Sequence, residues 1–324
     1  MINLNLAKFY QKNILSDFLK KLNFIKYIYI SIKLIHFNIN ILNTTISNST
    51  LKATIKHSGA ELTSLKDNQN KEYIWEGNPD FWGKHSPILF PIVGTLKNNT
   101  YSVNGKEYQL PRHGFARDME FQLIDKTENS ATFSLQSDEE TLKKYPFEFE
   151  LQLIYTLSES ALDIQYKVIN NSSDKMPFSI GAHPAIALPE NFENYAFKFE
   201  KKETLKYYLL ENDLISNNTK VLETYDDIVP LNYKLFENDA LIFKTLESKS
   251  LTILENSKPY IKVDFEDFPS LGLWTKDQAP FICVEPWLGY SDTAENSGDL
   301  FEKEGVLVLN SNQVFNSKFS IKIL

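Results

Sequence analysis

The chain has 324 residues, 42% hydrophobic and 13% aromatic, which is enough for the core of one large all-β domain or two ordinary domains. Its formal net charge of -8, with no segment dense in lysine and arginine, argues against nucleic acid as a partner. The single cysteine, Cys283, excludes an intrachain disulfide and disfavours a cysteine-based zinc site, which agrees with a reducing, cytoplasmic location.

Residues 1–44 differ from the rest of the chain. They contain six lysines and one acidic residue, Asp17, so they carry +5 while the remainder carries -13. Lys26 and Lys33 interrupt the most apolar stretch, residues 22–42, which makes a membrane span costly. No secretory cleavage pattern is visible. We expect a dispensable or disordered extension, with a basic amphipathic helix at a membrane surface as the weaker alternative.

Residues 45–324 are predicted to form one domain of antiparallel strands. Apolar and polar residues alternate with a period of two, and turns rich in Asn, Gly, Ser and Asp separate the runs. Residues 101–108 predict a tight hairpin, because Asn104-Gly105 accepts the positive φ angles of a type I′ turn. Further strands are predicted at residues 151–157, 162–168, 251–254, 260–265, 306–309 and 319–323.

Helix signals are few. Ser137 followed by Glu140 predicts a capping box that opens a short helix to about Lys144, before Pro146 ends it. No internal repeat or Pro/Gly-rich linker divides the chain after the extension. The expected fold is therefore all-β: one large antiparallel β-sandwich with few short helices.

The only two arginines of the chain, Arg112 and Arg117, bracket His113 in the segment Pro111–Arg117. Arginine carries a planar fork of donors and a permanent charge, which suits the binding of hydroxyl pairs, carboxylates or phosphates. A proton-transfer residue between two such forks is what a site for an oxygen-rich ligand needs. The alternative is a surface turn with two unrelated arginines.

Two further segments carry residues suited to acid–base chemistry. His183 lies in Ser179–Ala185, where small residues allow a close approach and Pro184 fixes the direction of the chain. Glu285 ends an apolar strand, Phe281–Val284, beside Trp287; desolvation there would raise the pKa of the carboxyl. The alternatives are a structural histidine in a tight turn and a glutamate that caps an edge.

Several other chemistries lack their signatures. The chain contains no GxSxG, GxGxxG, P-loop or HExxH motif. Cys283, inside an apolar strand, is more typical of core packing than of a nucleophile.

Six segments in order resemble the aldose 1-epimerase (galactose mutarotase) superfamily, most closely its LacX-like branch. The resemblance runs from about Thr45 to Leu324, and these segments carry it: Gly59–Leu65, Pro87–Gly94, Arg112–Arg117, Gly181–Ala185, Val263–Pro269 and Glu285–Trp287. It implies a galactose mutarotase-like supersandwich with a sugar cleft and no cofactor or metal. Residues 45–324 would then be the catalytic domain.

The resemblance also implies roles for particular residues. Glu285 would be the general base for the anomeric hydroxyl, His183 the general acid for the ring oxygen, and His113 the group that orients the substrate near that oxygen. Asp239 resembles the family's acid that binds sugar hydroxyls, and Trp287 would stack on the sugar. The classical enzymes place an arginine near the N-terminal part of the cleft, where this chain has none, so Lys84 or His85 would substitute.

The substrate class stays open at this point. Arg112, Arg117 and Lys84 would form a phosphate patch if the substrate were a hexose 6-phosphate; a free aldose is slightly favoured. A non-catalytic sugar-binding or sensing protein on the same fold is the second alternative, and a glycoside hydrolase or lyase that uses Glu285 with Asp239 is a third. We expect a monomer or homodimer whose only partner is a small sugar, with no membrane and no nucleic acid.

Overall fold

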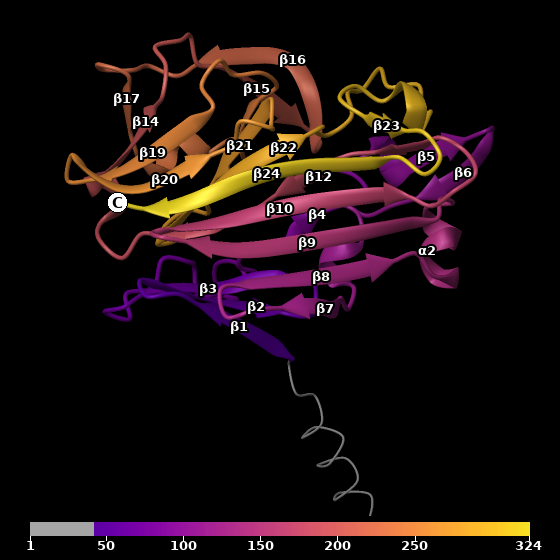
Figure 1. The fold of residues 1–324 in the computed structure, drawn as a ribbon. Coiled ribbons are helices and arrows are strands. Elements are labelled where there is room, and N and C mark those ends of the chain that lie inside the picture. The colour runs from indigo at the N-terminus through magenta and orange to yellow at the C-terminus, as the bar shows by residue number, and fades with distance from the viewer. Residues whose placement is uncertain (1–41) are drawn as a thin grey trace, which may run out of the picture. The chain divides into compact units, whose positions relative to one another are not determined.

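The structure, a computed structural model, describes residues 42–324 (Figure 1). The expectation for the extension, residues 1–44, lies outside the described residues except at its last three positions. Of these, Asn43 and Thr44 belong to strand β1 (Asn43–Ser47), and the hydroxyl of Thr44 bonds His57 Nε2 at 2.8 Å. The first described strand thus begins two residues before Thr45.

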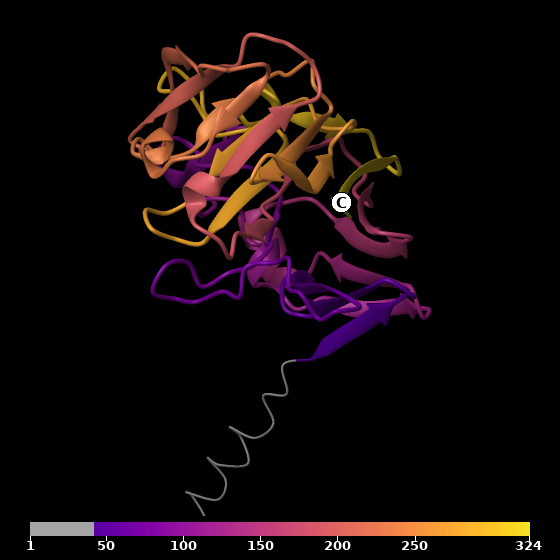
Figure 2. The same cartoon turned by 90° about the vertical axis from the view of Figure 1, so that its left-hand side faces the viewer.

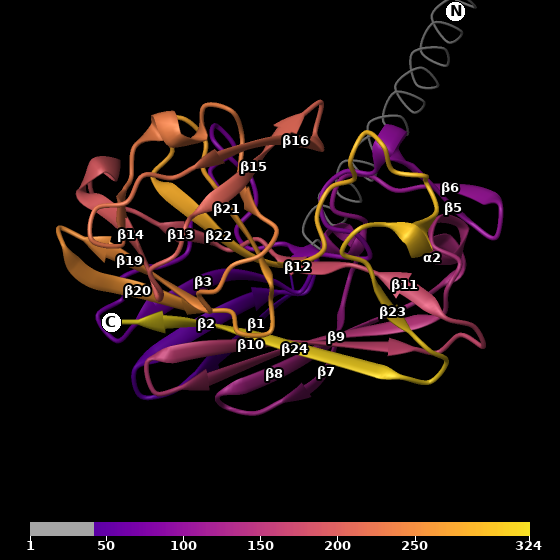
Figure 3. The same ribbon diagram turned by 90° about the horizontal axis from the view of Figure 1, so that it is seen from above.

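The larger of two main sheets has nine antiparallel strands. In sheet order they are β17 (Ile228–Pro230), β14 (Tyr195–Phe199), β19 (Ser250–Glu255), β20 (Lys258–Asp264), β24 (Val314–Ile323), β10 (Ala161–Asn170), β9 (Phe149–Ser158), β8 (Ser130–Gln136) and β7 (Gln122–Lys126). Figure 3 shows the long strands β8, β9, β10 and β24 side by side.

The second main sheet has eight strands, and its strand β22 (Phe281–Leu288) carries Glu285 and Trp287 of the predicted site. Its order is β16 (Leu214–Val221), β15 (Lys206–Glu211), β18 (Leu241–Phe243), β21 (Ser270–Trp274), β22, β12 (Ile180–Ala182) and β4 (Ile88–Leu89), and β13 (Ala185–Ala187) also pairs with β22.

Smaller elements complete the described part of the chain. One three-stranded sheet joins β1, β2 (Leu51–Lys56) and β3 (Glu61–Asp67); it lies beside β7 and β8, where the Ser47 amide donates to the Glu128 carbonyl (Figure 2). Two further sheets have two strands each: β5 (Thr100–Val103) forms a hairpin with β6 (Lys106–Gln109), and β11 (Met176–Phe178) pairs with the distant β23 (Leu307–Leu309). The short helices are α2 (Glu139–Lys144), η1 (Lys97–Asn99), η2 (Ala116–Asp118), η3 (Phe192–Asn194), η4 (Tyr233–Phe236) and η5 (Leu300–Glu302).

One hydrophobic core lies between the two main sheets. Along β9 and β10, buried residues alternate with partly exposed ones, as the period-two pattern predicts. Their buried side chains join Ile282 and Val284 of β22 in a single cluster. Burial of each such side chain contributes roughly 1.5–3 kcal/mol, so face-to-face packing of the sheets supplies the main driving force. The predicted all-β sandwich is confirmed.

The predicted turns are also present. Asn104 and Gly105 both have positive φ angles between β5 and β6, and Asn256 and Ser257 do so between β19 and β20. The helix start needs a correction, because the cap of α2 is Asp138 and not Ser137. The Asp138 carboxylate accepts the Thr141 amide at 2.7 Å, and the Thr141 hydroxyl bonds the Asp138 amide in return.

Candidate active site

A cavity of about 350 Å³ brings most of the predicted site together. Its size is at the lower end of the range for small-ligand pockets, roughly 300–1,000 Å³. Seven of the nine residues selected from the sequence line it, together with three that were not selected. The ten lining residues are Trp82, Arg112, His113, Arg117, His183, Asp239, Ala240, Trp274, Glu285 and Trp287.

His183 and Glu285 meet at the floor of this cavity although 102 positions separate them in the chain. His183 follows β12 and Glu285 lies within β22, and these strands pair through Gly181 and Trp287. The Nε2 atom of His183 is 3.2 Å from Glu285 Oε2, an ion-pair distance, although the contact does not meet the angular limits of a hydrogen bond. The exposed fractions of the side chains are only 11% and 2%.

Burial acts in opposite senses on the two groups. Desolvation raises the pKa of the Glu285 carboxyl well above its ordinary value; the charge of Asp239 adds to this rise and that of Arg112 opposes it. Desolvation lowers the pKa of His183 to about 3. In the empty cavity, the uncharged forms of both groups are therefore favoured, and the pair holds one proton on the carboxyl.

His113 lies on a sharply turned backbone with φ at 68°. Gly114, which follows at φ 70°, approaches Phe90 so closely that a Cβ atom would be 2.2 Å from the Phe90 carbonyl oxygen. The Gly94 amide donates to His113 Nδ1 at 3.1 Å, and the His113 amide donates to the Gly94 carbonyl. These contacts fix the ring against the backbone of residue 94.

The same contacts determine which nitrogen of His113 carries the proton. Burial lowers the pKa of this ring well below its ordinary value, so it is neutral. A neutral imidazole that accepts at Nδ1 bears its hydrogen on Nε2, which becomes a donor. The Arg112 Nε–H group points at Nε2 from 3.2 Å and donates to it in the other tautomer, so the tautomer with hydrogen on Nε2 requires the flexible arginine side chain to turn away. Both nitrogens cannot accept at once, and the fixed backbone amide holds Nδ1.

The two arginines are held by carboxylates and by the backbone. Arg112 Nη1 is 3.2 Å from Asp213 Oδ1, at the turn between β15 and β16. Arg117 Nη2 donates to the Arg112 carbonyl at 2.9 Å, and its Nε lies 3.6 Å from Asp118 Oδ2. Both guanidinium groups line the cavity wall, in agreement with the sequence prediction.

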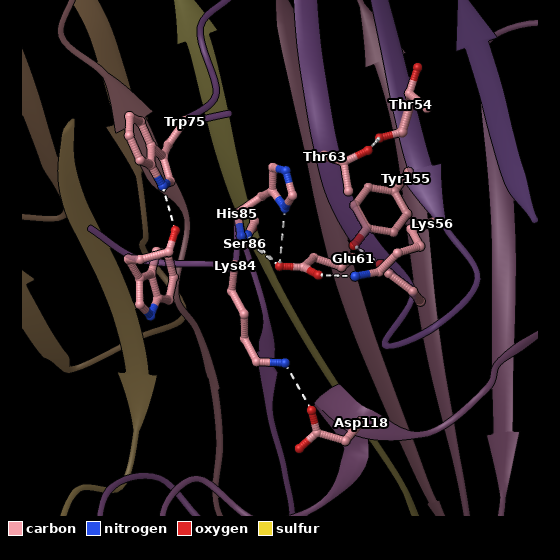
Figure 4. A network of polar contacts seen from close by, with 12 residues as sticks. Thr54, Lys56, Glu61, Thr63, Trp75, Lys84, His85, Ser86, Asp118 and Tyr155 are labelled. Atoms are coloured by element: carbon pink, nitrogen blue, oxygen red, sulfur yellow. Dashed lines mark hydrogen bonds and ion pairs between the residues drawn. The ribbon is translucent and has the colours of Figure 1, made fainter. Parts of the chain in front are cut away.

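Lys84 and His85 do not line the cavity. Lys84 Nζ pairs with Asp118 Oδ1 at 2.8 Å, and His85 Nδ1 lies 3.7 Å from the buried carboxylate of Glu61 (Figure 4). Neither residue therefore substitutes directly for the arginine of the classical enzymes. The cationic contribution to the cavity comes from Arg112 and Arg117.

Sequence reasoning missed two tryptophans of the cavity. Trp82 stacks on His183 with ring centroids 4.7 Å apart and an interplanar angle of 26°, and Trp274 meets the same imidazole edge-on at 5.8 Å. Neighbouring residues hold these two tryptophans in place; for example, Trp75 Nε1 donates to the backbone carbonyl of Trp82 at 2.8 Å. The chain has four tryptophans, and three line the cavity, so this scarce residue type was an unused signal.

One set of donor atoms near the cavity has the composition of a metal site. Ligand atoms of His183, Cys283 and Glu285 lie within 4.8 Å of one another, and all three residues are buried. Burial, followed by the charge of Glu285, raises the pKa of the Cys283 thiol well above its ordinary value, which opposes the thiolate form that metals bind. A metal here would also occupy both groups of the acid–base pair.

Among residues 42–324, no helix combines the length and apolar character that crossing a membrane requires.

Comparisons with known proteins agree with this fold. The sequence pattern of the family described as aldose 1-epimerase matches residues 43–307. Protein LacX of Lactococcus lactis subsp. lactis is 36% identical over 295 residues, covering 86% of this chain and 98% of that protein. A galactose mutarotase-related enzyme from Lactobacillus acidophilus superposes with a TM-score of 0.83 at 35% identity, covering 87% and 97% of the chains. A galactose mutarotase-like protein from Lactobacillus casei superposes with a TM-score of 0.83 at 32% identity, and the match covers 87% of this chain and 100% of that protein.

The fold and the site thus define a galactose mutarotase-like β-sandwich, a class of proteins that act on sugars. Within that class, the chain belongs to the aldose 1-epimerase family, in its LacX-like branch. Membership of this family supports an isomerase with a function of the sugar epimerase type.

Proposed function

We propose that the protein is an aldose 1-epimerase that interconverts the α and β anomers of a free aldose by opening and closing the sugar ring, without a cofactor. One observation carries the proposal: an imidazole and a carboxyl with opposed pKa shifts lie 3.2 Å apart in a cavity of small-ligand size. A binding protein needs hydroxyl-binding groups but no such proton-sharing pair.

Ring opening requires the charged form of the pair. Transfer of the proton from Glu285 to His183 across the 3.2 Å contact gives a carboxylate and an imidazolium. The charge of Arg112 lowers the pKa of Glu285 and so favours this carboxylate. A sugar that fills the cavity supplies hydroxyl groups that stabilise both charges, which compensates for the water it displaces.

The proposed chemical step balances its protons and electrons. The Glu285 carboxylate takes the proton of the anomeric hydroxyl, O1 becomes a carbonyl oxygen, and the C1–O5 bond breaks with its electron pair on O5. His183 protonates O5, while the Nε2–H group of His113 orients that oxygen. Rotation about C1–C2 and the reverse proton transfers then close the ring on the other face. The open-chain intermediate coexists with neutral His183 and protonated Glu285, which is the form that burial favours.

The remaining wall of the cavity suits a sugar ring. Trp82, Trp274 and Trp287 offer flat apolar surfaces of the kind that pack on the C–H face of a pyranose. Asp239 and the two arginines offer hydrogen-bonding groups for hydroxyls.

The contacts of the cations favour a free aldose over a hexose 6-phosphate. Arg117 and Lys84 both pair with Asp118, and Arg112 pairs with Asp213. Each of the three cations of the suggested phosphate patch already faces a carboxylate, which offsets part of its charge and would repel a phosphate placed beside it. Neutral hydroxyls meet no such repulsion.

Polarimetry tests the proposal. Freshly dissolved α-glucose or α-galactose should approach its equilibrium rotation faster with the protein than in buffer alone, in proportion to protein concentration. Glucose 6-phosphate serves as the comparison substrate and should be accelerated less. Measurable sugar binding without acceleration of any aldose would instead support the sensing alternative, and release of reducing ends from an oligosaccharide would support the hydrolase alternative.

A further inference from the structure

Glu61 is a buried acid that the proposed chemistry does not use. It belongs to the Gly59–Leu65 segment, which begins in the turn between β2 and β3, and only 1% of the residue is exposed. It does not line the cavity. A buried carboxylate is costly unless it is paired and hydrogen-bonded, so its contacts indicate what it holds.

Those contacts join three segments of the chain. Glu61 Oε1 accepts the backbone amides of His85 at 2.7 Å and Ser86 at 3.1 Å, and Oε2 accepts Lys56 Nζ at 2.7 Å (Figure 4). Burial alone would raise the pKa of this carboxyl, but the bonds from His85 and Lys56 outweigh it and lower the pKa to about 2. Glu61 is therefore ionised at neutral pH, and each of its two oxygens accepts at least one hydrogen bond.

The residues that Glu61 holds support the turn that carries His183. The His85 carbonyl accepts the Ala185 amide at 2.9 Å, and the Ala185 carbonyl accepts the Trp75 amide at 2.9 Å. Ala185 lies two residues after His183 and pairs with Cys283 in β22, two residues before Glu285. A displacement of residues 85 and 86 would therefore move the backbone that sets the distance between His183 and Glu285.

Two close glycine contacts connect the same region to other parts of the cavity wall. The ring of His85 packs against Gly77, where a Cβ atom would be 2.7 Å from the imidazole; Gly77 lies five residues before Trp82. At Gly59, two residues before Glu61, a Cβ atom would be 2.6 Å from the Arg117 carbonyl oxygen. The segment that holds Glu61 thus contacts the backbone of Arg117 directly and reaches that of the His183 turn through His85.

We propose that Glu61 is a positioning residue for this site: its carboxylate fixes the His85–Ser86 backbone, and through Ala185 it sets the reach of His183 toward Glu285. The expected effect on turnover rests on the proposed function, whereas the expected effect on the position of His183 does not. Glu61 contacts neither the sugar cavity nor the acid–base pair directly, so its effect should fall on turnover and not on sugar binding.

Two variants separate the contacts of Glu61. Glu61→Ala leaves the two backbone amides without an acceptor and should lower kcat about 100-fold, the cost expected of a misplacement near 1 Å. Glu61→Gln keeps an acceptor oxygen for those amides but loses the charge that pairs with Lys56. Its kcat should be about tenfold higher than that of Glu61→Ala. KM should stay within about twofold for both, because the groups that bind sugar are unchanged.

Glu203 supplies a matched control. Its carboxylate also accepts two backbone amides, those of Glu247 and Ser248, both at 2.8 Å, and it does not line the cavity. Glu203→Ala should lower the melting temperature but leave kcat unchanged. If Glu61→Ala and Glu203→Ala lowered the melting temperature equally and also lowered kcat equally, Glu61 would have only a general structural role.

A second measurement does not depend on activity. The imidazole ¹⁵N signals of His183, assigned by comparison with His183→Ala, should move in Glu61→Ala and remain in place in Glu203→Ala. Unchanged His183 signals in a folded Glu61→Ala protein would overturn the proposal. If the unaltered protein accelerated no aldose, the proposed function would fail, and the imidazole signals would still decide the role of Glu61.

Discussion

At the scale of single residues, the site depends on a carboxyl and an imidazole that share one proton. Each group is costly to charge in the cavity, and each has the other as its nearest titratable partner at 3.2 Å. The two groups therefore titrate as a pair, and an apparent pKa belongs to the pair.

Removing either member of the pair should abolish most of the activity. Glu285→Gln cannot take the anomeric proton, and His183→Ala cannot protonate the ring oxygen, so each should lower kcat by about 10²–10⁴-fold. Both proteins should fold, since neither change leaves a buried charge without its partner. Polarimetric rates together with melting temperatures check this; a Glu285→Gln protein with full kcat would refute the assigned base.

The opposed shifts predict an unusual dependence of rate on pH. The active free enzyme carries one proton on the pair. A second proton binds to the pair only at low pH, because the pKa of His183 is lowered to about 3. The remaining proton leaves the pair only at a pH far above the ordinary range of a carboxyl, because the pKa of Glu285 is raised. We expect kcat/KM, corrected for the buffer reaction, to stay flat as the pH rises from about 5 through the ordinary histidine range. A limb centred at about pH 6.5, the ordinary histidine value, would contradict this assignment.

At the scale of elements, the cavity wall depends on glycines in neighbouring strands. Trp287 of β22 packs over Gly181 of β12 and Gly272 of β21, where a Cβ atom would lie 2.6 Å and 2.5 Å from atoms of the indole. The absence of side chains at these positions gives the indole room against the sheet. Strand pairing together with these two glycines thus determines where Trp287 lines the cavity.

Gly272→Ala should push Trp287 out of this position. The clash should cost about 1–3 kcal/mol of unfolding free energy and should raise KM for the sugar, since the indole lines the cavity. Gly105→Ala provides the comparison: its backbone is strained at φ 76°, but no atom lies within 4 Å and the hairpin is outside the cavity. It should lower stability without changing KM. Chemical denaturation and initial rates measure both effects.

At the scale of the whole molecule, the described fold begins at β1. Its five residues pair with β2 from Asn43 to Ser47, and β1 contains no residue of the cavity. Residues 1–41 lie outside the described part of the chain, and their expected dispensability stays a prediction.

Removal of residues 2–41 should leave kcat and the melting temperature unchanged, because β1 keeps its pairing with β2. Removal of residues 2–47 should lower the melting temperature, because it deletes β1 and the bond from Thr44 to His57. Scanning calorimetry and polarimetry on both truncated proteins compare the outcomes. Loss of solubility or activity in the shorter truncation would show that the extension contributes to the folded protein.

The sequence determined those features that depend on neighbouring residues in the chain. The period-two pattern predicted the antiparallel strands, and Asn104-Gly105 predicted the hairpin of β5 and β6. Three of the six short segments that carry the resemblance also contain six of the residues that line the cavity, and a separate match selected the seventh, Asp239. Such features can be predicted from the sequence because turn geometry and side-chain alternation depend on residues that are close together in the chain.

Only the tertiary structure decided which residues meet across the fold. Lys84 and His85 are polar residues near the right segment, yet Asp118 and Glu61 hold them outside the cavity, and these partners come from distant parts of the chain. Trp82 reaches His183 for the same reason, through a loop anchored by Trp75. A side chain's partners depend on how sheets pack and loops close, so distances such as that from His183 to Glu285, and the pKa shifts that burial causes, arise only when the chain has folded.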